Sequence, residues 1–465
     1  MLRDRYDPLD LFAQIPTLAM RMDPVLAQMD TLLADDLLFA AVKADLITRF
    51  PHTSTDGRPS TPVEVILRML VVKHLYHWSF PQTSQFVSDS LVLRQFCRVY
   101  FATVPDQSTL NRWARLIQPT TLHRLLDRVV HLATVCQVTE GRKLRCDGTV
   151  VETDIHHPSD STLLNDGVRV LSRTLQRARQ VLTDAGAVAQ TAFVDHTHHA
   201  RERMKQIMEV ARQKGEDAAD RLKTAYGDLL DLTQTVVEHA QQVASVLHQQ
   251  TNDTVEQVLT TLETMLPRVQ QVINQTTRRV LNGEAVPAPE KIVSLFEPHT
   301  AILRKGKAGK PTEFGREVWL DEVDGGIITR YAVLEGNPDE KAQLLPSIEH
   351  HRAQFGQAPA LVTADRGVYS APNERDAAAA GVSAVVLPKP GKKSAKRTAH
   401  EQQDWFRAGR KWRAGIEGRI SDLKRRHGLK RCRYHGADGM ERWVGLGLLA
   451  HNLRIIARQN AAESK

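Results

Sequence analysis

The stretch from residue 316 to residue 390 most constrains the fold, because strand-like and helix-like segments alternate along it. Its first part, "REVWLDEVDGGIITRYAVL", has two β-rich runs around Asp324-Gly325-Gly326, a pattern typical of a β-hairpin. A helix-like segment, "DEKAQLLPSIEHHRAQF", leads to the strand-like "PALVTAD", and a further helix leads to the strand-like "SAVVLPK". Strands connected in these two ways predict one mixed sheet with helices on its faces.

An earlier segment supplies another strand. Residues 142–157, "RKLRCDGTVVETDIHH", are rich in β-forming residues. Two further helical regions follow the last strand, at about 402–426 and 440–458. The predicted order, once a long interruption after the first strand is removed, is β-β-β-α-β-α-β-α. We therefore predict an α/β fold with a mixed sheet and a large all-α insertion.

The interruption covers roughly residues 165–295. Apolar residues repeat there in steps of three and four, in one run from Leu222 to Val246 and in another from Val255 to Val280. These runs predict long helices packed as an antiparallel hairpin or a coiled coil. Pro267 is expected to kink the second helix or to begin a new one. The insertion could be a dimer arm, a DNA clamp, or a helical insertion with its own small core.

Residues 1 to about 135 are predicted to be helical throughout. The segment "TPVEVILRMLVVKHLYHW" has apolar residues at helical spacing. In "PDQSTLNRWARLI", Asp106 or Ser108 can cap a helix that carries Arg112 and Arg115. Short helices of this kind are compatible with a DNA-binding helix-turn-helix and equally with an ordinary helical bundle.

Basic residues are concentrated near the end of the chain. The 465 residues include 62 Lys and Arg against 54 Asp and Glu, a net charge of +8. The window from Lys389 to Arg433 alone holds 16 basic and 4 acidic residues, a net charge of +12. Such a concentration favours a polyanionic partner, and we expect DNA.

Other classes of protein are disfavoured by what the sequence lacks. The four cysteines form no CxxC pair, so the sequence indicates neither a zinc ribbon nor a disulfide framework. The N-terminal "MLRDRYDPLD" is charged, and no apolar run reaches the ~18 residues of a membrane span. A GxxxxGK[ST] motif is missing too. We expect a soluble intracellular protein with no membrane partner and no nucleotide cofactor.

Three acids occupy comparable positions in the predicted fold. Asp147 lies on the first strand, Asp365 follows the fourth strand, and Glu417 lies on a late helix. The first and fourth strands can be neighbours in such a sheet, and the last helix can cross their ends. Three close carboxylates repel one another, and a divalent cation relieves that repulsion. Oxygen ligands suit Mg²⁺ or Mn²⁺, and two such ions about 3.5–4 Å apart can catalyse phosphodiester displacement.

Two other acids compete with Asp147 for the first position. Asp154 is an odd number of residues further along, so on a regular strand it faces the opposite way. Asp160, in "HPSDS", is better explained as a helix cap or loop residue. Strand parity therefore leaves one of Asp147 and Asp154 for this position, and the "DGT" setting of Asp147 favours it through the family resemblance described next.

Three segments, "CDGTVVETDIHHPSDSTLLNDGVRVL", "VTADRGVYSAPNERDAAAAGVSAVVLPK" and "RAGIEGRISDLKRRHGLKRCRYHG", resemble the signature regions of bacterial insertion-sequence DDE transposases. The "EFGREVWL" hairpin and the "ERWVGLGLLAHNLRIIA" tail most resemble the ISNCY type. The resemblance covers about residues 40 to 460. It implies a ribonuclease-H-like fold and metal-dependent DNA strand transfer. Asp147, Asp365 and Glu417 would be the catalytic and metal-binding residues.

Such transposases often carry a Tyr, Arg, Glu and Lys signature around the glutamate. Arg413 and Lys424 match the arginine and lysine of that pattern, while Arg410 stands at the tyrosine position. The loop-like "PGKKSAKRTAH" is expected to be mobile and to order on DNA. The residues predicted to bind DNA are Arg413, Lys424, Arg410, Arg425, Arg426, Lys389, Lys392 and Lys393.

These inferences combine into one prediction of domains and function. We predict a transposase that cleaves the ends of its element and transfers them into target DNA. Its predicted cofactors are two Mg²⁺ or Mn²⁺ ions, and its predicted partners are DNA and further copies of the chain in a homo-oligomer. The resemblance implies a bacterial cytoplasmic protein that associates with the nucleoid when acting. A hydrolytic nuclease of the same fold and an inactive DNA-binding transposase remnant are the alternatives. The predicted domains are a helical DNA-binding domain at 1–135, a catalytic domain at 142–164 and 296–433, the helical insertion at 165–295, and a C-terminal helix at 434–465.

Overall fold

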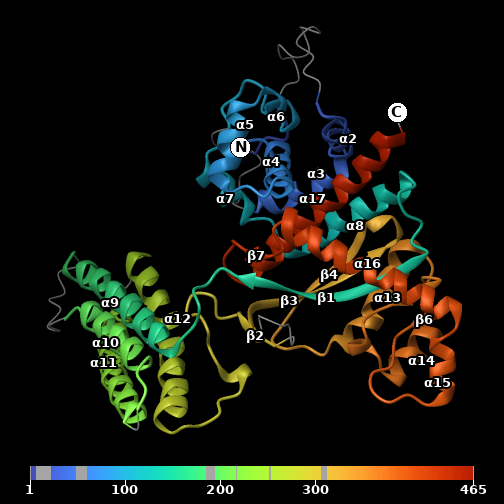
Figure 1. Ribbon diagram of the computed structural model, residues 1–465. Coiled ribbons are helices and arrows are strands. Elements are labelled where there is room, and N and C mark those ends of the chain that lie inside the picture. The colour runs from blue at the N-terminus through green and yellow to red at the C-terminus, as the bar shows by residue number, and fades with distance from the viewer. Residues whose placement is uncertain are drawn as a thin grey trace. The chain divides into compact units, whose positions relative to one another are not determined.

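The computed structural model describes residues 2–6, 22–48, 60–184, 194–215, 217–250, 253–304 and 312–463 (Figure 1). The chain divides into two compact units. One unit combines Met1–Asp154 with Arg316–Lys465, and the other is Ile155–Gly315. The finer division predicted from the sequence, with its boundaries at 135, 164, 295 and 433, remains a prediction.

A mixed sheet of 7 strands forms the centre of the α/β fold, which confirms the predicted fold class at this level. Strands β3 and β4 pair antiparallel, whereas β1, β5 and β6 pair parallel. The path through the sheet is β2-β3-β1-β5-β6, with β4 paired to β3 and β7 paired to β1. The short strands β2 and β7 were not predicted. The strands are β1 (Lys143–Thr153), β2 (Ala301–Leu303), β3 (Glu313–Val323), β4 (Ile328–Leu334), β5 (Leu361–Thr363), β6 (Ala384–Val386) and β7 (Arg431–Cys432).

Strand β1 is much longer than its parallel neighbours. Its first residues pair with β5, from Lys143 beside Leu361 to Arg145 beside Thr363. Its last residues, Glu152 and Thr153, pair with β7. Because β5 stops at Thr363, the middle of β1 lies beyond the end of its neighbour. The carboxyl ends of parallel strands are where α/β proteins bind ligands.

The β3–β4 hairpin turns through Asp324–Gly326, as the sequence predicts. Gly325 and Gly326 have φ values of 80° and 78°, in the left-handed region that favours glycine. The Asp324 carboxylate accepts hydrogen bonds from the backbone N–H groups of Glu140 and Lys143. These bonds tie the turn to the start of β1.

Five helices follow β4 along the chain. Helix α13 contacts β1 and β4, helix α14 contacts β6, and α16 contacts β1, β5 and β6. Helix α17 contacts β4 and β7 and also packs on α2, α4 and α8 near the N-terminus. The predicted helices at about 402–426 and 440–458 are confirmed by α16 and α17. The five are α13 (Leu344–Phe355), α14 (Ala371–Ala379), α15 (Ala395–Glu401), α16 (Asp404–Arg426) and α17 (Ala437–Glu463).

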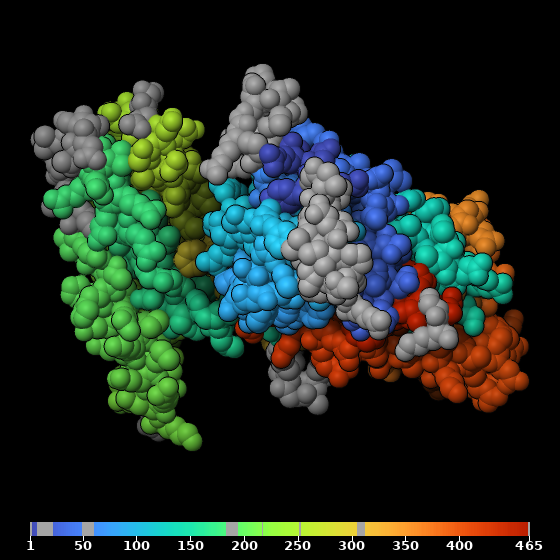
Figure 2. Space-filling model, turned by 90° about the horizontal axis from the view of Figure 1, so that it is seen from above, coloured from blue at the N-terminus to red at the C-terminus, as the bar shows by residue number. Residues whose placement is uncertain are grey.

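The N-terminal part is helical and shares one apolar core with α17. Figure 2 shows the red C-terminal segment beside the blue N-terminal helices. Helix α4 is buried on all sides from Val63 to His74. Asp106, not Ser108, caps α7, because its carboxylate accepts from two backbone N–H groups. The helices are α2 (Pro24–Leu32), α3 (Asp36–Ile47), α4 (Val63–Leu75), α5 (Phe80–Asp89), α6 (Leu91–Phe96), α7 (Gln107–Ala114) and α8 (Pro119–Val135).

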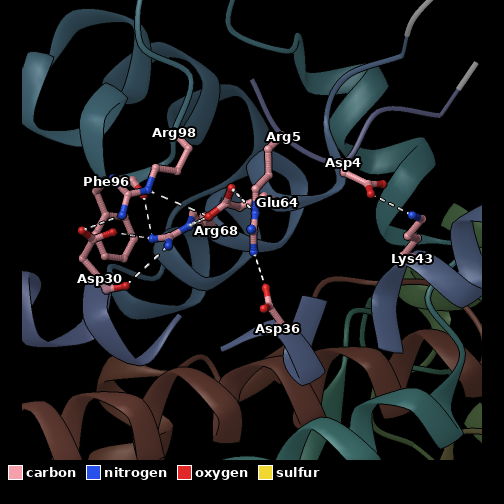
Figure 3. Close-up of polar contacts among 9 residues, drawn as sticks. All are labelled: Asp4, Arg5, Asp30, Asp36, Lys43, Glu64, Arg68, Phe96 and Arg98. Atoms are coloured by element: carbon pink, nitrogen blue, oxygen red, sulfur yellow. Dashed lines mark hydrogen bonds and ion pairs between the residues drawn. The ribbon is translucent and has the colours of Figure 1, made fainter. Parts of the chain in front are cut away.

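A buried arginine joins three of these helices (Figure 3). The Arg68 side chain is 0% exposed and donates to Glu64 at 3.0 Å and to Asp30 at 2.6 Å. It also donates to the Phe96 carbonyl at 3.0 Å. Arg98 binds the other oxygen of Asp30 at 3.0 Å. Burying a guanidinium is costly, and paired carboxylates with a carbonyl offset that cost.

The unit Ile155–Gly315 is built from long helices around its own apolar core. Helices α11 and α12 pack on each other and on α9, and α10 packs on α9 and α11. Helix α12 continues through Pro267, so the expectation that this proline begins a new helix is wrong. The helices are α9 (Asp160–Asp184), α10 (Thr197–Val210), α11 (Ala218–Leu247) and α12 (Asp253–Thr276).

Two smaller findings concern the cysteines and the length of the helices. Cys97, Cys136, Cys146 and Cys432 are all free thiols. Within the described part of the chain, every helix is too short or too polar to cross a membrane.

Candidate active site

Asp147 and Asp365 lie on neighbouring parallel strands. In the paired part of β1 and β5, Lys143 lies beside Leu361 and Arg145 lies beside Thr363. If this register is extended past the end of β5, Asp147 comes level with Asp365. Asp147 lies on β1 itself, and Asp365 follows β5, where its carboxylate caps the short turn Arg366–Val368. Neighbouring strands lie about 4.8 Å apart, so this register brings the two acids to one place.

Glu417 reaches the same place from helix α16 through an arginine. Arg413 lies one helical turn before Glu417, and its Nη1 is 3.1 Å from the Glu417 carboxylate. Arg413 Nη2 is 3.0 Å from Asp147, and its Nη1 is 4.0 Å from Asp365. The three predicted catalytic acids therefore surround one guanidinium, which is itself 20% exposed.

The three carboxylates are bridged by the Arg413 guanidinium and do not contact one another as a single close group. Among the described residues, they do not form a set whose ligand oxygens all lie within 4.8 Å of one another. Asp147 is largely buried, whereas Asp365 and Glu417 are 49% and 68% exposed. The two exposed side chains lie where solvent or a substrate can reach them.

Helix α16 lies very close to the sheet because of one buried ion cluster. Arg145 of β1 donates twice to Glu322 of β3, at 2.9 and 2.6 Å, and once to the Trp412 carbonyl of α16 at 2.6 Å. Arg419 of α16 binds the same Glu322 at 3.1 Å. A Cβ atom at Gly415 would lie 2.3 Å from the Arg145 guanidinium, so this position needs glycine. The cluster thereby fixes the helix that carries Glu417.

Burial and like charge act together on Asp147. Burial is the largest influence and raises the pKa of Asp147 to about 6, although Arg413 works in the opposite direction. The neighbouring Asp365 and Glu340 carboxylates raise this pKa further. A site with excess carboxylate charge and oxygen donors fits a hard divalent cation. Mg²⁺ and Mn²⁺ are ions of this class.

Two acids near Asp147 were missed in the sequence. A Cβ atom at Gly148 would lie 2.5 Å from a Glu317 oxygen and 2.9 Å from a Glu340 oxygen. Glu317 is a buried acid on β3, and that unusual place for an acid in a strand was a usable signal. Glu340 lies in the short 3₁₀ helix between β4 and α13. Acids are common at such positions, so nothing in the surrounding sequence marks Glu340 as part of the site.

The basic residues predicted to bind DNA have varied surroundings. Arg410, Arg425 and Lys392 are exposed, whereas Arg426 pairs with Asp422 at 3.0 Å. Lys424 lies on α16, seven residues after Glu417. Nothing in the structure tests their contact with DNA, which stays a prediction.

The segment "PGKKSAKRTAH" is held in place by Glu401 and is largely helical in α15. Burial works to raise the pKa of Glu401, but hydrogen bonds from Lys393 and Arg397 lower it to about 2. The Lys389 backbone N–H also donates to Glu401, at 2.9 Å. The expected loop is therefore helical from residue 395 onward, whereas its mobility and its ordering on DNA stay predictions.

The two rival acids have other partners. Asp154 follows the end of β1, is 56% exposed and lies 3.6 Å from Arg431. Asp160 begins α9 and pairs with Arg279 at 2.9 Å within the helical unit. Among the described residues, the acids within 4.0 Å of the Arg413 guanidinium are Asp147, Asp365 and Glu417, and neither rival is one of them.

Two family models match parts of the chain. A transposase domain (DUF772) matches residues 19–116, and a transposase DDE domain matches residues 378–457. The second stretch includes Arg413, Glu417 and Lys424 but neither Asp147 nor Asp365. No curated protein and no solved structure matches the chain. The first two acids of the site therefore depend on the geometry described above.

Proposed function

We propose that the chain is an insertion-sequence DDE transposase, which cleaves the ends of its element and joins them to target DNA. The two stretches that match transposase domains support this proposal. In this proposal the fold is ribonuclease-H-like, and Asp147, Asp365 and Glu417 are the catalytic carboxylates. The ISNCY type stays a prediction, because neither family model names it. The carrying observation is that Arg413 lies within 4.0 Å of carboxylate oxygens of Asp147, Asp365 and Glu417.

The proposed cofactor is a pair of Mg²⁺ or Mn²⁺ ions. Asp147 and Asp365 would hold one ion, and Glu417 would hold the second. When bound, such ions polarise the scissile phosphodiester and stabilise its attacking and leaving oxygens. Burial is the main cause of the raised pKa of Asp147, and the Asp365 and Glu340 carboxylates raise it further, so the site holds like charges that a cation would relieve.

The proposed reaction has two displacements at phosphorus. Water attacks the phosphodiester at the element end, and the leaving oxygen departs as a 3′ hydroxyl. That hydroxyl then attacks a target phosphodiester, and a target 3′ oxygen leaves in its turn. One phosphodiester replaces another in the second step, so no nucleotide cofactor is required.

The basic side chains would bind and orient the DNA. Arg413 and Lys424 would contact phosphate oxygens at the reacting end, and exposed Arg410 and Arg425 would extend that contact along α16. We propose that the N-terminal helices bind the inverted repeat. Two element ends have to react together, which supports a homo-oligomer. Phosphate contacts of this kind give affinity that falls steeply with salt.

The experiment uses DNA duplexes taken from just outside the reading frame, where inverted repeats are expected. With Mg²⁺, the full chain should join precleaved ends of these duplexes to a target plasmid. Asp365→Asn should lose cleavage and joining by at least about a thousandfold while DNA affinity stays unchanged, because the half-exposed Asp365 side chain contributes little to folding. Asp154→Asn is the matched control and should stay active.

The outcomes separate the alternatives. Nicking without a joined product would favour the hydrolytic nuclease. DNA binding without nicking by the wild-type protein would favour an inactive remnant. Cleavage by Asp365→Asn at the wild-type rate would refute the catalytic assignment.

A further inference from the structure

Another group of metal-binding side chains lies at the C-terminal end of α16. Asp422 is on α16, His427 follows its last turn, and His451 is on α17. One ligand atom from each residue lies within 4.8 Å of the other two. We propose that these three residues bind a divalent transition-metal ion of the zinc class, separate from the ions of the carboxylate site.

The strongest support is a set of buried nitrogen atoms without hydrogen bonds. Both imidazoles are 0% exposed. Among the described atoms, Nδ1 of His451 has no hydrogen-bond partner, and neither ring nitrogen of His427 has one with good geometry, although the His74 backbone acts weakly on that ring. A buried polar atom left unpaired destabilises the folded state, so such atoms call for an explanation such as a bound ion. A single ion would satisfy one nitrogen of each ring.

The second ring nitrogen of His451 indicates its tautomer. His451 Nε2 lies 3.4 Å from the Gly326 carbonyl, to which it can donate its proton. Nδ1 then carries the lone pair, and it lies 3.8 Å from the Asp422 carboxylate. Metal-binding histidines commonly have this arrangement, with one nitrogen on the metal and the other held by a carbonyl.

The charges around the group both help and oppose a cation. Burial lowers the pKa of His427 to about 4 and the pKa of His451 well below its usual value, so both rings are neutral and can act as ligands. Arg419, Arg426 and Arg454 are the nearby cations. Arg419 is paired with Glu322, and Arg426 is 55% exposed and can leave Asp422 for solvent. Three neutral histidines suffice for zinc in some enzymes, so one carboxylate and two imidazoles are an adequate set.

The proposed ion would act on the position of α16. Asp422 is five residues after Glu417, which places it about 140° around the helix and ~7.5 Å along it. The two sites therefore use different faces of α16. An ion at Asp422, His427 and His451 would fasten the end of α16 to α17 and to the Gly326 turn.

The test measures metal binding by the full chain. The protein is stripped with a chelator, placed in excess Mg²⁺ to fill hard oxygen sites, and titrated with Co²⁺, whose visible absorption reports nitrogen ligands. We expect saturation at one equivalent and displacement by Zn²⁺. His427→Gln should weaken Co²⁺ binding by at least about tenfold, because it removes a direct ligand. Asp422→Asn should weaken it too, and its 25% exposed side chain makes misfolding a smaller concern.

Two control variants make the result specific. His350→Gln removes a partly exposed imidazole paired with Asp127 and should leave Co²⁺ binding unchanged. Asp365→Asn should also leave it unchanged, even though the proposed function requires that variant to be inactive. Absence of a Co²⁺ signal in the wild-type protein would overturn the proposal. A signal that survives both His427→Gln and Asp422→Asn would overturn it as well.

Discussion

At the scale of single residues, Asp147 is proposed to be catalytic, and its burial lowers the free energy of unfolding when the carboxyl is ionised. Its folded pKa of about 6 lies above the ordinary value of 3.8, and burial is the main cause. Between those two pH values the folded state binds more protons than the unfolded state. The stability of the wild-type protein therefore falls as pH rises through this range, and the full cost is present above about pH 6.

Asp147→Asn should therefore stabilise the metal-free protein at pH 8 while abolishing DNA cleavage. The expected gain in the free energy of unfolding is about 1–3 kcal/mol, and it should become very small near about pH 3, below the ordinary pKa, where the wild-type carboxyl is largely protonated in both states. Denaturant titrations of both proteins at the two pH values measure the difference. A loss of stability at pH 8 would contradict the electrostatic account.

The same carboxyl predicts how metal binding depends on pH. A proton on Asp147 competes with the ion, so apparent Mn²⁺ affinity should fall about tenfold for each pH unit below about 6. Calorimetric titration of the full chain between pH 5 and pH 8 measures this slope. Affinity that does not change between pH 5 and pH 6 would rule out Asp147 as a ligand with this pKa.

At the scale of elements, α16 depends on its close approach to the sheet. Gly415 and Gly418 are near neighbours on this helix, but only Gly415 faces a crowded site. A Cβ atom at Gly415 would meet the Arg145 guanidinium, whereas one at Gly418 would meet nothing within 4 Å. The two glycines therefore make a matched pair of substitutions on one helix.

Gly415→Ala should lower stability by about 1–3 kcal/mol and reduce cleavage, because Arg145 or the helix has to shift and Glu417 moves with it. Gly418→Ala should raise stability by up to about 1 kcal/mol, because alanine is the better helix former. Thermal denaturation and single-turnover cleavage measure both effects. Equal effects from the two substitutions would refute the packing argument.

The sequence predicted the long elements well and the short contacts poorly. Strands β1, β3 and β4 and helices α16 and α17 have patterns long enough to recognise. Strand β7 has two residues, too few for any alternation to be visible. The register of Asp147 with Asp365 followed from strand order, but the contacts of Arg413 depend on how near α16 lies to the sheet. Glu401 pairs with Lys393 and Arg397, and the second pair forms because α15 is helical. The sequence analysis missed these pairs, because it interpreted the basic residues of this segment as ligands for DNA.

At the scale of the whole molecule, the chain has separate apolar cores in its two units. The core of Ile155–Gly315 is made from its own helices, and Leu229 of α11 is 0% exposed within it. Leu446 of α17 is 1% exposed in the core shared with the N-terminal helices. Each unit can therefore lose packing without direct loss of packing in the other.

Calorimetry should accordingly resolve two unfolding transitions. Leu229→Ala and Leu446→Ala should each remove about 2–5 kcal/mol from one transition and leave the other nearly unchanged. The two variants serve as controls for each other. A single transition that shifts equally in both variants would mean that the units unfold together.

Arg413 also bears on how the chain folds in the absence of metal. An unrelieved group of acids would oppose folding, because like charges repel. The guanidinium belongs to the chain itself and lies against Asp147, Asp365 and Glu417 once α16 has docked. A counter-charge built into the polypeptide would let it fold whether or not ions occupy the proposed site.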